Sequence, residues 1–374
     1  MKYLILLIVF TQIIFCEHVL YQVKRHGELI YFNSSNGNKE SIALKVNKFK
    51  IAYPWIAYTN LNKNLYAKNL RDKKVIDLGK SKLFKLGSEL LAFTNTKGKL
   101  YSLNLSLQKK RFHELGIRSF KTSRNALIWT NKKRTLKYYN AISTKTKVLQ
   151  KYCEFFQVSW PMLSHVDMGH QLYGTNLKSE ESRVLLSSFY IFQAASAGIL
   201  TLDRSYKLRY YNTSLKRVGI NKDIERVKDF KFVDHFILYR QYDTKNLMFR
   251  NLRAPETILR SKKPKTYQLA PHTLTIINNK GGLEIENSDY KMFSLPAIYR
   301  AKSKYKRLLT GNSILSYTIR NQVFLYNAKI GKEYKIAKSV YWMELEGMNQ
   351  RRPLKSLKKL NFSQIHQDKY SQVQ

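Results

Sequence analysis

The sequence predicts a repetitive all-β protein that is exported from the cytoplasm, on the basis of three observations. A short motif recurs at a near-constant step, β-branched and aromatic runs alternate with polar turn residues, and an uncharged apolar stretch lies near the N-terminus. The chain has 374 residues, 44% of them hydrophobic, which is enough for a sizeable core.

The N-terminal segment predicts an export signal over residues 1–16. Lys2 supplies a positive charge, residues 3–10 carry no charge, and Glu17 ends the apolar stretch. The stretch is shorter than the ~20 residues that span a bilayer, so a signal peptide is favoured over a transmembrane helix. We therefore expect an extracytoplasmic protein, either secreted or associated with the cell envelope.

Cys16 stands at the expected cleavage point and leaves two possibilities open. Residues 13–16 (Ile-Ile-Phe-Cys) resemble in part the lipobox of bacterial lipoproteins, which implies a lipid anchor on Cys16. Phe15 departs from that motif, because a small residue is expected there, and the alternative is an ordinary signal peptide cut after Cys16. In both cases Cys153 is the one cysteine left within the fold, so no internal disulfide is expected.

The recurring motif is a Leu or Val followed four positions later by Asn. It occurs nine times, at Asn-to-Asn intervals of 35 to 40 residues. The motifs end at Asn33, Asn69, Asn104, Asn140, Asn176, Asn212, Asn251, Asn287 and Asn327. An Asn at the end of a strand can bond to nearby backbone and tolerate left-handed turn geometry. We therefore predict a structural role for this residue and not an array of binding sites.

Each unit contains three further strand-like runs around the motif. In the second unit these are residues 49–52, residues 55–60 and the basic residues 73–77. Units of four short antiparallel strands resemble the blades of a β-propeller. The resemblance covers residues 17–346 and is to divergent propellers of the exported type, because the Gly-His and Trp-Asp signatures of WD repeats are absent.

The resemblance implies a ring of eight or nine four-stranded blades. The first unit lacks room for its innermost strand, and residues 340–343 are expected to supply it, so that the two termini share one blade. Nine blades exceed the usual four to eight, so the unit around residues 159–188 is a candidate for irregular packing. Residues 347–374 are predicted to form a flexible basic tail.

The charge balance predicts an attraction to polyanions. The chain has 67 Lys and Arg against 25 Asp and Glu, a formal net charge of +42. Such an attraction weakens as salt is added. The alternative is the composition of an AT-rich genome, since Lys, Asn, Ile and Tyr are all abundant.

Residues that could carry catalysis or bind a metal are sparse. Two pairs of carboxylates alternate along strands and could share a face, but solvent-facing strand positions explain them better than a glycosidase pair. These are Glu284 with Glu286 and Glu344 with Glu346. His165, Asp167 and His170 lie within six residues, which we interpret as a polar loop and not as a metal site. We expect no catalytic residue, metal or cofactor.

A repetitive scaffold without a catalytic constellation predicts a non-enzymatic binding protein. Its partner would be another protein or an anionic polymer, at the cell envelope or outside the cell. Export argues against nucleic acid as the ligand, and membrane contact would come only through a lipid anchor. The competing hypothesis is a polysaccharide hydrolase or lyase with its site at the centre of the ring.

Overall fold

The structure is a computed structural model that describes residues 18–22, 27–219, 224–253, 257–270, 273–279, 283–287, 292–294, 309–310, 314–319, 322–328, 330–338, 340 and 342–345. The predicted signal segment with Cys16, Glu346 and the predicted tail lie outside these residues. Within them the chain forms strands and turns, so the predicted all-β class is confirmed. None of the described residues belongs to a helix long and apolar enough to cross a membrane.

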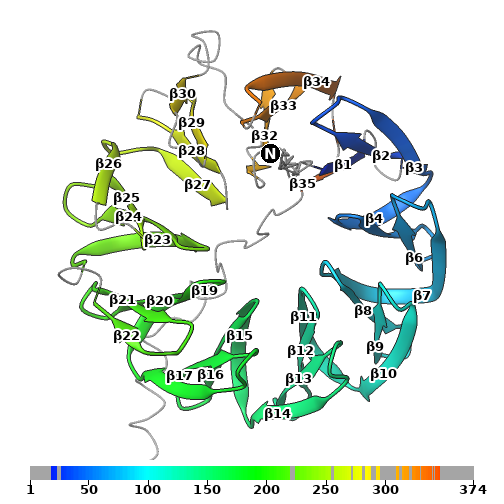
Figure 1. The fold of residues 1–374 in the computed structure, drawn as a ribbon, viewed down its shortest axis with the longest axis horizontal. Helices are drawn as coiled ribbons and strands as arrows, with labels where there is room; N and C mark the ends of the chain where they lie inside the picture. Colours follow the sequence, from blue (N-terminus) through cyan, green and yellow to red (C-terminus); the bar gives the residue numbers. More distant parts are fainter. Residues whose placement is uncertain are drawn as a thin grey trace, which may run out of the picture.

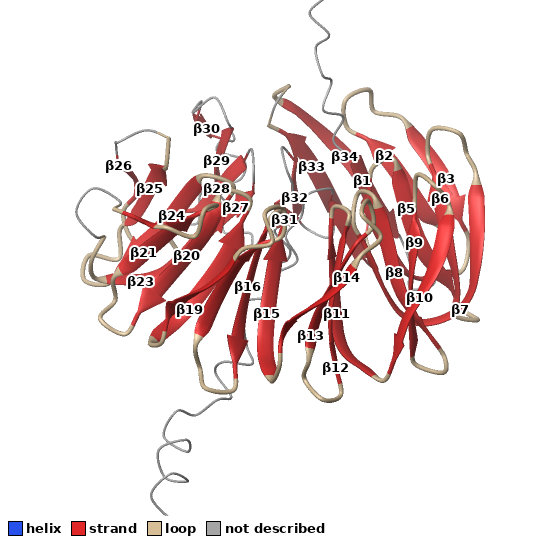
Figure 2. Ribbon diagram, turned by 60° about the horizontal axis from the view of Figure 1, so that its bottom comes forward, coloured by secondary structure: helices blue, strands red, loops and turns tan. Residues whose placement is uncertain are grey.

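The strands form nine blades of four antiparallel strands around a ring, which is a β-propeller (Figure 1). We label the strands of each blade A to D from the ring axis outward; the A strands of most consecutive blades contact one another. Neighbouring strands are antiparallel, so the turns of all blades fall on two faces of the ring (Figure 2). The A–B and C–D turns lie on the AB face. The B–C turns and the starts of the A strands lie on the BC face.

Blade 1 contains β35 (Trp342–Leu345), β1 (His18–Gln22), β2 (Leu29–Asn33) and β3 (Lys39–Ala43). Blade 2 contains β4 (Val46–Ala52), β5 (Trp55–Asn60), β6 (Asn64–Asn69) and β7 (Val75–Leu86). Blade 3 contains β7, β8 (Leu90–Asn95), β9 (Lys99–Asn104) and β10 (Lys109–Leu115). Blade 4 contains β11 (Ile117–Ser123), β12 (Ala126–Asn131), β13 (Leu136–Asn140) and β14 (Thr146–Gln150). Blade 5 contains β15 (Cys153–Ser159), β16 (Met162–Asp167), β17 (Leu172–Asn176) and β18 (Ser182–Leu186).

Blade 6 contains β19 (Phe189–Ala195), β20 (Gly198–Asp203), β21 (Leu208–Asn212) and β22 (Arg217–Val218). Blade 7 contains β23 (Val227–Val233), β24 (Phe236–Gln241), β25 (Leu247–Asn251) and β26 (Thr257–Ser261). Blade 8 contains β27 (Thr266–Ala270), β28 (Thr273–Ile277), β29 (Leu283–Asn287) and β30 (Met292–Ser294). Blade 9 contains β31 (Leu309–Thr310), β32 (Ile314–Ile319), β33 (Gln322–Asn327) and β34 (Lys332–Lys338).

The long strand β7 decides the blade count. Lys80 in this 12-residue strand pairs with Asn64 of β6, and Ser81 pairs with Asn95 of β8. The first half of β7 is therefore strand D of blade 2, and its second half is strand A of blade 3. Of the eight or nine blades that the sequence allows, the structure has nine.

The expectation that residues 159–188 pack irregularly is wrong. Strands β15 to β18 pair in the same order and with the same register as in other blades. Gly174 of this unit packs closely against side chains of blade 6. A Cβ at Gly174 would come within 2.7 Å of Leu215 Cδ2 and 2.9 Å of Ile199 Cδ1.

The two ends of the propeller meet in blade 1, as the sequence predicts. Strand β35 pairs antiparallel with β1, with Val19 opposite Leu345 and Gln22 opposite Trp342. The closing strand was expected at residues 340–343 and lies two residues later. A side-chain bond also closes the ring, because Asn327 Nδ2 of blade 9 donates to Ser34 Oγ of blade 1 at 2.9 Å.

The repeated Asn has the predicted structural role. Asn176 Oδ1 accepts hydrogen bonds from the backbone N–H groups of Lys178 at 2.9 Å and Ser179 at 3.3 Å, which fixes the C–D turn. The same turn bond occurs at Asn33, Asn69, Asn104, Asn140, Asn212 and Asn251. The sequence does not reveal a second role: Asn176 Nδ2 donates to Thr213 O of the next blade at 2.8 Å.

The core consists of the interfaces between blades. Strands β5, β8, β12 and β16 have their first five residues buried, because each blade packs against a neighbour on both sides. One cluster joins Leu90 and Ala92 of blade 3 to Phe120 and Trp129 of blade 4. An aromatic residue recurs in the A strands of blades 2 to 8 and is buried in each, at Phe49, Phe84, Phe120, Phe156, Phe192, Phe230 and Tyr267.

The residue after this aromatic residue is always Lys or Gln, at Lys50, Lys85, Lys121, Gln157, Gln193, Lys231 and Gln268. Three of them donate to a backbone carbonyl in the A strand of the next blade. Lys121 Nζ bonds to Phe156 O at 2.6 Å, and Gln157 Nε2 bonds to Phe192 O at 3.2 Å. Gln193 Nε2 bonds to Phe232 O in the same way. These bonds tie neighbouring A strands together near the ring axis.

Substitutions at Lys121 test how much these bonds between neighbouring A strands stabilise the fold. Lys121→Gln introduces the residue that bonds to the next blade from blades 5 and 6, so we expect a change in unfolding free energy below about 0.5 kcal/mol. Lys121→Met keeps a side chain of similar length but cannot donate, and should lower the unfolding free energy by about 1 kcal/mol. Urea unfolding of both variants measures this difference. Equal stability of the two variants would show that the tie contributes nothing.

Candidate binding face

The A strands of blades 2 to 7 share an irregularity where they begin. Each has a β-bulge at the same place in its pairing with strand B. The bulged residues are Asn47, Lys82, Arg118, Glu154, Tyr190 and Lys228. They lie on the BC face in the strands nearest the ring axis, where a bulge turns a side chain out of the ladder. Lys82, Arg118, Tyr190 and Lys228 are exposed.

The BC face of blades 1 to 4 is strongly basic. Its exposed side chains include Lys45, Lys48, Lys63, Lys80, Lys82, Lys97, Arg118, Lys132 and Lys133. We call this set the basic arc. The nearby carboxylate of Glu114 is half-buried and accepts hydrogen bonds from Trp129 Nε1 at 2.7 Å and Asn131 Nδ2 at 3.0 Å. Burial alone would raise the pKa of Glu114, but these bonds and the Lys137 ammonium hold it below its usual value.

The BC face of blades 5 to 7 carries exposed aromatic rings instead. Tyr190, Tyr206 and Tyr242 are 42%, 36% and 51% exposed. The ring centroids of Tyr190 and Tyr206 lie 5.5 Å apart, and those of Tyr206 and Tyr242 lie 5.2 Å apart. Tyr152 and Met168, on the same face of blade 5, are also exposed, and the Met168 N–H bonds to Tyr152 O. We call these five residues the tyrosine arc.

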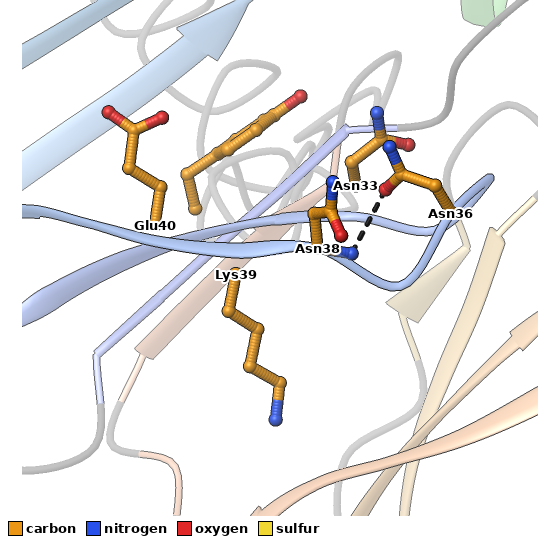
Figure 3. A pocket seen from close by; sticks show the side chains of 6 residues that line it. Asn33, Asn36, Asn38, Lys39 and Glu40 are labelled. Atoms are coloured by element: carbon orange, nitrogen blue, oxygen red, sulfur yellow. Dashed lines mark hydrogen bonds between the residues drawn. The ribbon is translucent and has the colours of Figure 1, made fainter.

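A hollow of about 390 Å³ lies on the AB face of blade 1 (Figure 3). It is lined by Tyr31, Asn33, Asn36, Asn38, Lys39 and Glu40. The Glu40 carboxylate accepts hydrogen bonds from Lys68 Nζ at 3.2 Å and from Lys73 Nζ, both in blade 2. Burial would raise the pKa of Glu40, but the two ammonium groups lower it overall. Glu40 is therefore held as an ionised link between blades, which does not suit a general acid.

An aromatic stack adjoins this hollow. The His18 ring shares a hydrogen bond with the Tyr31 hydroxyl and stacks on Tyr53 with 3.8 Å between centroids. The Arg71 guanidinium also lies over the Tyr53 ring, 5.3 Å from its centroid. Burial, helped by the Arg71 charge, lowers the pKa of His18 to about 4. The stack therefore joins blade 1 to blade 2 with a neutral imidazole.

His165, Asp167 and His170 do not form one site. His165 is fully buried in strand β16 and stacks on Tyr173, with 5.0 Å between centroids. Asp167 Oδ1 accepts a bond from the Gln171 N–H at 3.0 Å, and its Oδ2 accepts one from the Tyr173 hydroxyl at 3.1 Å. His170 is exposed in the turn. The prediction of a loop is correct for His170 alone, and the described residues contain no group of three side chains placed to hold a metal ion.

The two predicted carboxylate pairs lie on different strands. Glu284 and Glu286 are on β29, the C strand of blade 8, away from the ring axis. Glu284 Oε1 accepts a hydrogen bond from Asn278 Nδ2 at 2.8 Å. Glu344 pairs with Leu20 in the closing strand. Glu284 and Glu286 therefore stand away from the ring axis, which is where the competing hydrolase hypothesis requires its carboxylate pair.

Cys153 is the free thiol of the described residues, and it is fully buried. Burial raises its pKa to about 12, with the Phe155 carbonyl as hydrogen-bond acceptor. A thiol in this state is a poor nucleophile.

Comparisons with known proteins support the fold and no more. No protein-family model and no curated protein matches the chain. The crystal structure of a eukaryotic initiation factor is 9% identical over 89% of this chain and 97% of that chain, with a TM-score of 0.57. Dihydro-heme d1 dehydrogenase NirN in complex with DHE is 10% identical over 88% of this chain and 74% of its own, with a TM-score of 0.45. The tricorn protease is 10% identical over 87% of this chain and 47% of its own, with a TM-score of 0.41.

The buried His165 predicts a pH-dependent stability. Burial lowers its pKa to about 4 in the folded protein, against about 6.5 in the unfolded chain. Between these values the unfolded chain binds a proton that the folded chain does not, so stability present above about pH 6.5 is lost as the pH falls toward 4. Neither ring nitrogen of His165 has a hydrogen-bond partner.

Lowering the pH from 7 to about 4.5 should reduce the unfolding free energy of both proteins. We expect the reduction in His165→Phe to be smaller than in the native chain by on the order of 2 kcal/mol. A phenyl ring suits the position, since blades 3 and 4 hold Phe93 and Trp129 there. Urea unfolding at the two pH values measures the difference. His170→Asn, in the exposed turn, is the matched control and should follow the native chain. The same acid loss in His165→Phe would contradict this account.

Proposed function

We propose that this chain is an exported, non-enzymatic β-propeller scaffold that binds an anionic polymer through its BC face. The observation that carries the proposal is the set of bulged residues around the ring axis, where Lys82, Arg118 and Lys228 are exposed on one face. A bulge repeated in six blades brings side chains from distant parts of the sequence to one rim.

The charge of the chain supports a polyanion as the partner. The basic arc includes the bulged residues Lys82 and Arg118 and extends over blades 1 to 4. The whole chain has a formal net charge of +42. Cations gathered on one surface produce a positive potential that attracts extended anions and raises their rate of association. The uncharged apolar stretch after Lys2 supports export, which places the partner at the cell envelope or outside the cell.

The roles of the described carboxylates support a scaffold over a hydrolase or lyase. Glu40 and Glu114 are held between blades by lysine and by N–H donors. Asp229 accepts bonds from Arg240 and from the Tyr267 hydroxyl of the next blade, and this raises the pKa of Tyr267 further above the value that burial gives it. Carboxylates fixed in this way stabilise blade interfaces and are not poised to exchange protons with a substrate.

The test compares two triple charge reversals of equal size. Lys82→Glu with Arg118→Glu and Lys228→Glu changes the bulged residues of the BC face. Lys109→Glu with Lys145→Glu and Lys216→Glu changes exposed lysines of the AB face. With polyphosphate or dextran sulfate as probes, we expect the first variant to lose about ten-fold or more in affinity and the second less than about three-fold. Binding of the unmodified protein should weaken as NaCl is raised, and neutral dextran should not bind.

Equal losses in the two variants would show that bulk charge and not the BC face attracts the polymer. Absence of binding to both probes at low salt would contradict the proposal outright. Turnover of either polymer by the purified protein would contradict its non-enzymatic part.

A further inference from the structure

The tyrosine arc occupies positions where the fold does not require an aromatic residue. Other blades hold Asn47, Lys82, Arg118, Glu154 and Lys228 at the bulge that Tyr190 occupies. The B–C turn position of Tyr206 has a positive φ in the other described turns, where it holds Lys63, Gly98, Arg134, His170 and Lys245. Equivalents of Tyr242 are Leu61, Thr96, Lys132, Met168 and Arg204. Tyrosine at all three positions is therefore a property of blades 6 and 7 and not of the repeat.

Tyr206 is placed at a conformational cost. Its φ is 61°, a left-handed value that a bulky side chain seldom adopts. Its ring lies beside those of Tyr190 and Tyr242, and the neighbouring Tyr190 is the first cause of the raised pKa of Tyr206. The rings of Tyr190 and Tyr206 are 29° from parallel. An exposed ring held in this way gains little for the core, so its value lies in what it contacts from solvent.

The three rings form one contiguous aromatic platform over neighbouring blades, with Tyr190 and Tyr206 29° from parallel and Tyr206 and Tyr242 46° from parallel. Tyr190 comes from β19, Tyr206 from the turn between β20 and β21, and Tyr242 from the turn after β24 (Figure 1). The two centroid separations are 5.5 Å and 5.2 Å, comparable to the length of one sugar ring. A run of amphipathic rings with hydroxyl groups at their edges fits the C–H face of a pyranose and the hydroxyls around it.

Charges around the platform are positive or already paired. Arg204 and Lys228 are exposed beside it. Three carboxylates near it each have a basic neighbour: Asp243 pairs with Arg226 at 2.6 Å, Glu225 pairs with Lys207 at 2.6 Å, and Glu154 lies 3.7 Å from His170 Nδ1. A ligand on this surface therefore combines flat apolar faces with negative charge.

We infer that the tyrosine arc is the subsite of an acidic polysaccharide, whose sugar rings stack on Tyr190, Tyr206 and Tyr242 while its carboxylates meet the basic arc. The inference rests on the proposed function and adds the chemical class of the polymer. The competing occupant is an acidic protein segment, because tyrosine and methionine are also enriched at protein interfaces, and the test below therefore includes a poly-Glu peptide.

The test replaces each tyrosine with a neutral residue that another blade holds at the same position. Tyr190→Asn, Tyr206→Gly and Tyr242→Thr follow Asn47, Gly98 and Thr96, so the net charge and the repeat geometry are kept. Calorimetry with an oligogalacturonate and with a polyphosphate of equal charge measures affinity. We expect the triple variant to lose roughly ten-fold or more for the oligogalacturonate and less than about two-fold for the polyphosphate. The salt dependence of both should be unchanged.

Unchanged affinity for the oligogalacturonate would overturn the sugar subsite. The proposed function would then be judged separately by the bulged charge-reversal variant, whose loss of polyphosphate binding depends on no tyrosine. A poly-Glu peptide of equal charge that binds as tightly, and loses as much in the triple variant, would also overturn the inference in favour of a protein partner.

A triple Tyr→Phe variant covers the case in which the first variant unfolds. It keeps all three rings and removes the hydroxyls. Affinity for the oligogalacturonate within about three-fold of the native chain supports stacking on the ring faces. A ten-fold loss with a native melting temperature would assign the contact to the hydroxyl groups and overturn the platform.

Discussion

Contact between neighbouring blades is the constraint on which the rest of this molecule depends. Each sheet buries both of its faces, so a blade without a neighbour on each side would expose an apolar surface such as that of Trp129 or Phe120. The first blade is complete only when β1 pairs with β35, and these two strands are more than 300 residues apart in sequence. Ring closure through this strand pair and through Asn327 and Ser34 therefore stabilises every interface together.

The same constraint explains how the polar residues are distributed. Buried hydrogen-bonding groups need partners, and in this ring many of those partners lie in the next blade. Asn176 and Gln157 each donate to a backbone carbonyl of blade 6, and Glu114 accepts from blade 4. Several of the few carboxylates are consumed at interfaces in this way. With 67 Lys and Arg against 25 Asp and Glu, the remaining carboxylates are too few to pair with all the basic side chains, which leaves the chain strongly positive.

The sequence was sufficient for the parts of the fold that repeat. A motif at a constant step predicts the blades, and Asn at the end of a strand predicts its turn, because both depend on local chemistry. The closing strand was found to within two residues from the missing strand of the first unit. The count of nine was harder, because nine exceeds the usual four to eight blades and the sequence does not show that β7 pairs with both β6 and β8. Bonds between blades could not be predicted, because they depend on which turn lies beside which.

The residues of the BC face were harder still to predict from the sequence. A bulge is an extra residue in one strand relative to its partner, so Lys82 and Arg118 could be recognised only from the pairing register. Tyr190, Tyr206 and Tyr242 stand at three different places in the repeat, and no spacing in the sequence links them.

The two faces of the ring differ in how freely their residues can vary. On the AB face each C–D turn depends on its Asn, and the residue after it bonds to the adjacent A–B turn, as Leu177 does to Pro161. On the BC face a turn requires a side-chain cap at the end of strand B and a residue that accepts a positive φ. Its other positions hold different side chains in different blades, such as Leu61, Lys132 and Tyr242 at one equivalent position. Exposed side chains can therefore differ from blade to blade on the BC face without loss of the ring, and on this face blades 1 to 4 carry lysines where blades 6 and 7 carry tyrosines.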